Sequence, residues 1–236
     1  MSQLALILGL SWLAGFAAFL GSIAARLEGS ADTIGKQELV RGIVALGGGI
    51  LVAAVAFALA PTAVSELGPL CITFTFCLGG IAFCLLDVRI SSSGGSRAQL
   101  MAMLMDFFPE AISLGAVFGH NRGMGMLLAV FIAAQNLPEG FNSYREITAA
   151  GTKASSALRA LFCISFLGPL AAFLGHFLLQ DKTEWTAGIM SFAAGGILYL
   201  IFQDIAPQSR MERHWTPPLG AVLGFVIGMV GHQLIG

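Results

Sequence analysis

Charged side chains are scarce in this sequence. Lys, Arg, Asp and Glu make up 11% of its 236 residues and hydrophobic residues make up 56%, whereas a soluble domain carries roughly 25% charged residues. The mean hydropathy of +0.83 points the same way. A net charge of −1 leaves no basic surface for a polyanion, which excludes nucleic acid as a partner. The composition predicts an integral membrane protein.

Cysteine is rare as well, and no soluble segment interrupts the chain. The N-terminus has neither a basic region before its first apolar run nor a small-residue cleavage signal, so we expect that run to remain as a span. We expect residues 1–236 to form a single transmembrane domain.

Four cysteines lie in apolar runs without metal-ligand spacing, and we interpret them as small core residues: Cys71, Cys77, Cys84 and Cys163.

Apolar runs of the length that a bilayer requires, about 20 residues, predict an all-α polytopic bundle of eight transmembrane helices. Pro61 is expected to end the second span, and the stretch from Ser91 to Arg97 is expected to be a flexible loop. The expected spans are Leu4–Ala25, Leu39–Ala60, Leu67–Leu86, Leu100–Val117, Met124–Tyr144, Ala157–Leu179, Trp185–Ala206 and Pro218–Ile235.

Lysine and arginine gather in alternate connections between these spans. Only Arg122 and Lys182 lie in the even-numbered connections. Because cytoplasmic loops carry the excess of basic residues, the odd connections are predicted to be cytoplasmic and both termini to lie outside. The ten residues in or beside the odd connections are Arg26, Lys36, Arg41, Arg89, Arg97, Arg145, Lys153, Arg159, Arg210 and Arg213.

Four acids fall inside the predicted spans, namely Asp106, Glu110, Glu139 and Asp204. A charged residue at the centre of a bilayer costs about 3 kcal/mol on insertion scales, and no lysine or arginine lies at comparable depth. The acids therefore either hold protons, as hydrogen-bonded structural groups, or are compensated by a cation. The second reading predicts an ion site.

Helical spacing brings oxygen donors together. Asp106 and Glu110 share one helix face at i, i+4, and so do Gln135 and Glu139, while Asn136 can border the same cavity. The set of carboxylates and carboxamides suits a divalent cation.

Two prolines and a third helix extend this donor set. Pro109 and Pro138 each remove a helical hydrogen bond, which leaves the carbonyls of Met105 and Ala134 available as donors. The fourth and fifth spans form a hairpin, in which Glu110 and Glu139 are nearly equidistant from Met124 and are expected at similar depth. The seventh span adds Gln203 and Asp204.

Three segments carry a resemblance to a known family. Residues 135–140 (QNLPEG), 106–111 (DFFPEA) and 203–207 (QDIAP) resemble the proline-glutamate and His-Glu-containing motifs of the ZIP family of metal transporters. The resemblance implies eight spans with both termini outside, a homodimer, and an elevator-like movement of spans one, four, five and six against the others.

The resemblance also implies roles for individual residues. Asp106, Glu110, Gln135 and Glu139 would line a primary metal site. Asn136 and Asp204 would line an adjacent second site, bridged to the first by Glu139. Gln203 and Asp204 stand where the family usually has His-Glu.

The sequence departs from the family pattern at its nitrogen ligands. Asp106 and Phe107 replace the usual histidine and asparagine of the fourth span, so Phe107 is expected to remove a ligand from the second site. Without imidazole, an all-oxygen site favours manganese, iron or magnesium over zinc.

The functional hypothesis is a transporter of divalent cations in a plasma or bacterial inner membrane, moving metal towards the cytoplasm. It is not an enzyme and needs no cofactor beyond the transported metal. Two alternatives stay open: a proton-coupled carrier of small solutes that uses the same acids as a relay, and a relative that binds metal without transporting it.

Overall fold

A computed structural model describes residues 2–29, 33–93 and 97–235 of the chain. These residues form helices and no β-strand, which confirms the all-α prediction. In chain order the elements are α1 (Gln3–Glu28), α2 (Ile34–Ala54), the π-helix η1 (Val55–Leu59), α3 (Ala60–Glu66), α4 (Pro69–Ser93), α5 (Arg97–Val117), α6 (Arg122–Ala149), α7 (Ala154–Ile164), α8 (Leu167–Leu179), α9 (Thr183–Leu200), the π-helix η2 (Ile201–Ile205), α10 (Ala206–Ser209) and α11 (Leu219–Ile235).

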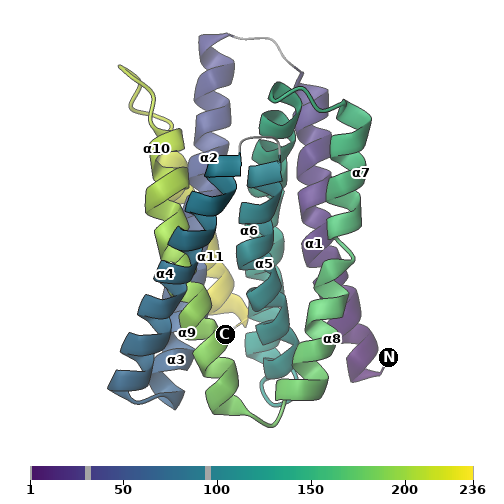
Figure 1. The fold of residues 1–236 in the computed structure, drawn as a ribbon, viewed down its shortest axis with the longest axis vertical. Coiled ribbons are helices and arrows are strands. Elements are labelled where there is room, and N and C mark those ends of the chain that lie inside the picture. Colours follow the sequence, from purple (N-terminus) through teal and green to yellow (C-terminus); the bar gives the residue numbers. More distant parts are fainter. Residues whose placement is uncertain (1, 30–32, 94–96, 236) are drawn as a thin grey trace.

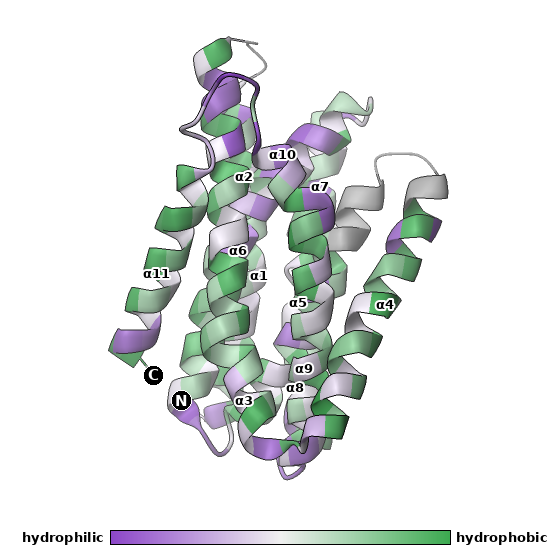
Figure 2. Cartoon of the chain, turned by 90° about the vertical axis from the view of Figure 1, so that its left-hand side faces the viewer, coloured by the Kyte–Doolittle hydropathy of each residue, from purple (hydrophilic) through white to green (hydrophobic). Residues whose placement is uncertain are grey.

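The helices stand side by side as one upright bundle (Figure 1). Six helical stretches in the described residues are long and apolar enough to cross a membrane. The other two predicted spans correspond to α5, with 21 residues, and to the shorter apolar helix α11, with 17 residues. Apolar residues cover the length of the bundle and hydrophilic ones gather towards its two ends (Figure 2). The chain is therefore a multi-pass integral membrane protein, as predicted.

The predicted basic connections meet at one end of the bundle, which we call the basic end. There Arg145 of α6 pairs with Glu28 of α1 at 2.5 Å, and Lys36 of α2 pairs with the same carboxylate at 3.2 Å. The termini lie towards the opposite end, where Gln3 donates a hydrogen bond to the carbonyl of Phe118, at 3.1 Å. The shared end agrees with the alternation of basic residues, and the prediction that it faces the cytoplasm follows from that charge bias.

Proline does not end the second span, so that prediction is wrong. The helix passes Pro61 and continues to Glu66, because the π-helix η1, which ends two residues before the proline, widens the turn. A widened turn relieves the clash between a proline ring and the carbonyl four residues before it. The same device, η2, precedes Pro207 in the seventh span.

Two other boundaries also differ from the prediction. The stretch from Ser91 to Arg97 is not a loop throughout, since α4 runs to Ser93 and α5 begins at Arg97; residues 94–96 lie outside the described part. The sixth span is divided into α7 and α8 at Ser165. Pro169 cannot donate to the carbonyl of Ser165, which explains the break at this point.

The cysteines are not core residues, contrary to the prediction. Cys71, Cys77 and Cys163 are exposed and Cys84 is half-buried. Because the lipid around a membrane protein is as apolar as its interior, an apolar run does not distinguish a lipid-facing residue from a buried one.

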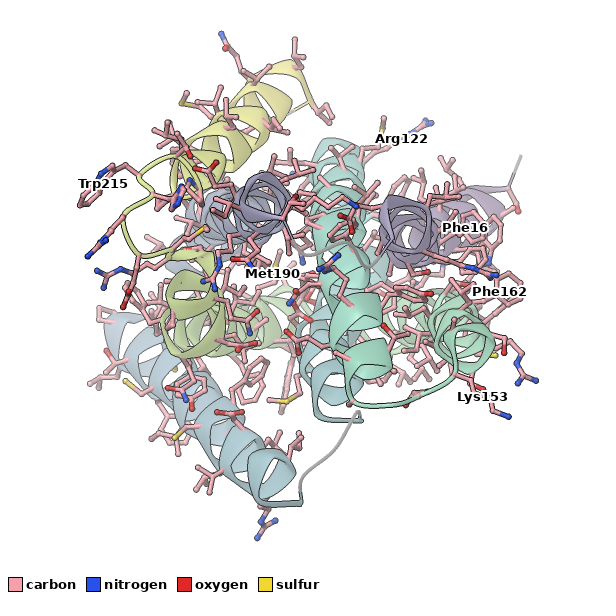
Figure 3. All side chains as sticks on the ribbon, turned by 90° about the horizontal axis from the view of Figure 1, so that it is seen from above. Phe16, Arg122, Lys153, Phe162, Met190 and Trp215 are labelled. Carbon is pink, nitrogen blue, oxygen red and sulfur yellow. The ribbon has the colours of Figure 1, made fainter. Side chains whose placement is uncertain are left out.

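The helices pack into two groups. The first group contains α1, α5, α6, α7 and α8, and the second contains α2, α3, α4, α9, α10 and α11 with both π-helices; most contacts between helices lie within a group. From above, Phe16 of α1 and Phe162 of α7 lie on one flank and Trp215, after α10, on the other (Figure 3). The two groups meet where α6 faces α2 and where α5 faces α9.

Glycine allows the closest approaches inside each group. A Cβ atom at Gly21 of α1 would collide with the carbonyl oxygen of Leu137, and one at Gly140 of α6 would collide with that of Ala18. Small residues at such crossings let the helix backbones touch. In the described residues, every glycine whose Cβ would run into a backbone oxygen in this way meets a helix of its own group: Gly21, Gly49, Gly79, Gly115, Gly140, Gly168, Gly175, Gly195, Gly220 and Gly224.

A pair of substitutions in α1 tests this packing. We expect Gly21→Ala to lower the stability of the protein by about 1–3 kcal/mol, the usual cost of overpacking. Gly9→Ala in the same helix has open space around the added methyl group, and alanine is the better helix former. In detergent, the melting temperature of the Gly21→Ala variant should therefore fall, whereas that of the Gly9→Ala variant should stay level or rise. Equal shifts in the two variants would contradict the close contact at Gly21.

Candidate metal site between the two helix groups

The antiparallel pair α5 and α6 holds its polar side chains in two layers. In the first layer, the Gln135 amide donates to a carboxylate oxygen of Glu110 at 2.5 Å. In the second, Asp106 and Glu139 line the wall of the same cavity. Glu110 therefore lies level with Gln135, and Glu139 lies about one helical turn further along α6, so the expectation that the two glutamates share one depth is not met. Equal distance along the chain ignores the geometry of the turn, which offsets the two helices by about one helical turn.

The acids of these layers are buried. Asp106 and Glu110 are 3% and 1% exposed, and Gln135 is fully buried. The Asp106 carboxylate accepts a hydrogen bond from the next backbone N–H, of Phe107, at 2.8 Å. No lysine or arginine lies beside the three carboxylates in the described residues, so negative charge gathers here without a basic partner.

Several oxygen atoms in this region have no hydrogen-bond partner. Both carboxylate oxygens of Glu139, the side-chain oxygens of Gln135 and Asn136, and the hydroxyl of Ser143 are buried and unpartnered. Buried polar atoms are normally satisfied, and each exception requires an explanation. A set of oxygens that lacks donors is the arrangement that a cation would satisfy.

A cavity of about 50 Å³ opens beside Glu139, between the two helix groups. One wall comes from Met103 and Asp106 of α5 and from Pro138, Glu139, Asn142 and Ser143 of α6; the other comes from Val44, Gly47 and Gly48 of α2 and from Leu200, Asp204, Ile205 and Gln208 of the seventh span. One water-sized probe occupies about 10–15 Å³, so the cavity has room for an ion with a few water molecules.

Asn136 and Glu110 stand behind this cavity rather than in its wall. The Asn136 amide donates to the carbonyl of Ala14 in α1, at 2.9 Å. Asn136 therefore ties α6 to α1, while its unpartnered oxygen remains available. Glu110 accepts a hydrogen bond from Gln135 in the first layer.

The two candidate residues of the seventh span, Gln203 and Asp204, point in different directions. Asp204 lines the cavity, and its carboxylate accepts a hydrogen bond from Gln208 at 2.5 Å. Gln203 is exposed and does not line the cavity, so the structure does not bring it to the other candidates. Neighbouring residues on a helix point about 100° apart, which lets only one of the two face inwards.

Phe107 also turns away from the cavity. Its ring reaches the crossing of α1 and α8, where it closes on Gly15 and Gly168. The residue that replaces the family's asparagine therefore contributes to the packing of the first helix group.

Sequence reasoning missed Asn142, Ser143 and Gln208. The signal was present, because Gln135, Glu139 and Ser143 follow one another at intervals of four residues on one face of α6. Asn142 borders this stripe and Gln208 lies four residues after Asp204. These side chains were overlooked because they are polar without being ionisable.

As it stands, no group of three or more His, Cys, Asp or Glu side chains in the described residues is gathered tightly enough to hold a metal ion. The donors that do converge are two carboxylates, Asp106 and Glu139, with Asp204 on the facing wall. An ion in the cavity would complete its coordination with amide oxygens and water. Such a mixed shell of oxygen ligands and water suits a hard divalent cation.

The fold and the cavity define a class, that of polytopic helical membrane proteins with an acid-lined cavity between two helix groups. The chain is similar to proteins that are named zinc transporters. Zinc transporter GufA of Myxococcus xanthus is 30% identical over 141 residues, which are 58% of this chain and 55% of that protein. Zinc transporter SLC39A7 of Homo sapiens is 25% identical over 158 residues, which are 64% of this chain and 33% of that protein. No family model matches the chain.

These similarities extend well beyond the short motifs and support membership of the ZIP family. The matched part spans about half of the bacterial relative and a third of the human one.

The layer formed by Gln135 and Glu110 can be tested without metal. Gln135→Leu removes the donor from a buried carboxylate, and we expect a loss of about 1–3 kcal/mol of stability. Adding Glu110→Leu should recover part of the loss, because the unpaired acid is then gone as well. Melting temperatures of the single and double variants in detergent report this coupling. Additive losses would contradict the pairing.

Proposed function

We propose that this protein carries divalent cations across the membrane, through the cavity between the two helix groups. The observation that carries the proposal is Glu139, whose two carboxylate oxygens are buried and unpartnered beside Asp106 in that cavity. An uncompensated pair of acids at membrane depth is costly unless a cation or protons neutralise it. Similarity to proteins named zinc transporters supports the cation.

The donor atoms favour a hard cation. Asp106, Glu139 and Asp204 offer carboxylates, and Asn142 and Gln208 offer amides, with no imidazole or thiol in the cavity wall. Oxygen-only sites suit Mn²⁺, Fe²⁺ or Mg²⁺, while zinc favours nitrogen and sulfur. We therefore propose manganese or iron as the preferred cargo, with zinc and magnesium as the competitors to be tested.

Transport requires the cavity to open to each side in turn. The first helix group contains the spans that the family resemblance assigns to the moving part, and glycine contacts knit each group internally. Where the groups meet, side chains such as Pro138 against Gly47 provide the contact instead. Because side chains rather than backbones meet at this boundary, it favours sliding of the two helix groups past each other as units. We propose that the cation is released at the basic end, towards the cytoplasm.

A homodimer remains a prediction from the family resemblance. The helix with the barest apolar flank is α4, of which Leu70, Phe74, Ile81 and Leu85 are exposed. This flank is the surface that we propose for a second copy of the chain within the bilayer.

Glu139→Gln is the central test, because it removes the charge and keeps the size of the side chain. We expect Mn²⁺ uptake into proteoliposomes to fall at least about tenfold, the factor equivalent to about 1.4 kcal/mol. Glu184→Gln is the matched control, since Glu184 is an exposed acid at the start of α9. Its uptake should equal that of the unmodified protein.

The same assay separates the rival functions. Equal uptake by the Glu139→Gln variant would remove Glu139 from the site. Saturable Mn²⁺ binding without uptake by the unmodified protein would identify a metal-binding relative that does not transport. Uptake of an organic solute that depends on a proton gradient and needs no divalent cation would identify a proton-coupled carrier.

Restoring a nitrogen donor should change the selectivity. In the Asp106→His variant we expect the ratio of Zn²⁺ to Mn²⁺ uptake to rise, because imidazole favours zinc. Competition of each unlabelled metal against radioactive Mn²⁺ uptake measures the ratio. An unchanged ratio, with uptake preserved, would place Asp106 outside the coordination shell.

A further inference from the structure

Four side chains form a continuous hydrogen-bonded chain at the basic end of the cavity, and it crosses from one helix group to the other. Asn142 of α6 donates to Glu146 of the same helix at 2.9 Å and to the amide oxygen of Gln208 at 3.1 Å. Gln208 of α10 in turn donates to the carboxylate of Asp204 at 2.5 Å. The link between Asn142 and Gln208 therefore joins the first helix group to the second.

The orientation of both amides follows from their neighbours. Ionised carboxylates only accept hydrogen bonds, so Glu146 and Asp204 each require an NH₂ group to face them. The oxygen of Gln208 must then point to Asn142, whose second N–H meets it. Each of the four side chains therefore faces a complementary group, and all the hydrogen bonds between them are formed when no cation is present.

Gln208 is held firmly on its own side. Arg41 of α2 donates to the backbone carbonyl of Gln208, at 3.3 Å, and also to that of Arg210. The side chain of Gln208 can therefore rotate while its backbone stays with the second group. Lys36 and Glu28 also connect the two groups at this end, but both side chains are partly exposed and such pairs contribute little.

A cation that reaches Asp204 conflicts with this arrangement. The NH₂ group of Gln208, which faces the carboxylate, repels a cation, whereas its carbonyl oxygen is a good ligand. If the amide turns to offer its oxygen, its NH₂ group faces the NH₂ group of Asn142. Two donors then oppose each other, and the bond between the helix groups is lost.

We propose that the Asn142–Gln208 hydrogen bond is a latch that closes the basic end of the cavity, and that a cation binding at Asp204 releases it. The inference rests on the proposed transport function and adds a role for two uncharged residues. The latch couples the binding of a cation at Asp204 to the separation of the two helix groups at the basic end. It also limits opening in the absence of cargo.

The experiment follows access to Ser143, a buried residue in the cavity wall. Ser143→Cys is made in a background in which Cys71, Cys77, Cys84 and Cys163 are replaced by alanine. The rate of reaction with a charged, membrane-impermeant maleimide is measured on purified protein, with and without Mn²⁺. We expect a slow reaction without metal and a faster one with Mn²⁺.

Adding Asn142→Leu should raise the metal-free rate by about fivefold, the factor that corresponds to one ordinary hydrogen bond, and Mn²⁺ should then add little. Gln208→Met is a second latch variant, for use should the first fail to fold. Thr148→Val is the matched control on α6, because the Thr148 hydroxyl bonds only to carbonyls of its own helix. Its rates should match those of the background protein.

A metal-free rate that both latch variants leave unchanged would overturn the latch. Fast reaction of the variants without acceleration of the background protein by Mn²⁺ would overturn release by the cation. The metal-free comparison does not depend on transport, and Mn²⁺ uptake measured in parallel shows separately whether the proposed function holds.

Discussion

Negative charge without a basic partner, held at membrane depth, is the constraint on which this structure depends. Asp106, Glu110 and Glu139 converge from two antiparallel helices, and of the three only Glu110 accepts a hydrogen bond from a side-chain amide. Such a site is stable only when positive charge or protons enter it. The rest of the molecule can be understood as the means of holding these carboxylates together while leaving one side of them open to a cavity.

Rigidity and mobility are distributed accordingly. Inside each helix group, backbones touch at glycines, and a contact of this kind leaves little freedom to shift. Between the groups lie the cavity, the hydrogen bond from Asn142 to Gln208, and the contacts of α6 with α2 and of α5 with α9. The carboxylates of α5 and α6 belong to the first helix group and Asp204 belongs to the second, so the movement that we propose would change which donors an ion meets.

Much of this could be predicted from the sequence. Apolar runs and the alternation of basic residues predicted the spans, because hydrophobic length and charge bias are properties of local sequence. The Pro-Glu segments led directly to the buried carboxylates. The paired layers, the inward turn of Asp204 rather than Gln203, and the uninterrupted helix past Pro61 could not be predicted. Each depends on how a turn or a π-helix sets the rotation of one helix against its neighbour.

The lipid-facing cysteines show the same limit from another side, since hydropathy does not report which face of a span is buried. Polar residues without charge were the other omission. Asn142 and Gln208 do not stand out by composition, and their importance appears only when two distant segments are seen to meet.

The layering of donors along α5 and α6 has an evolutionary consequence. Gln135 with Glu110, Asp106 with Glu139, and Asn142 with Gln208 follow one another along α6, and the first and third of these pairs are hydrogen-bonded. A substitution at one level can retune the chemistry there without disturbing the hydrogen bonds of the next. Single substitutions can therefore change the donor chemistry at one level while the helical scaffold stays the same.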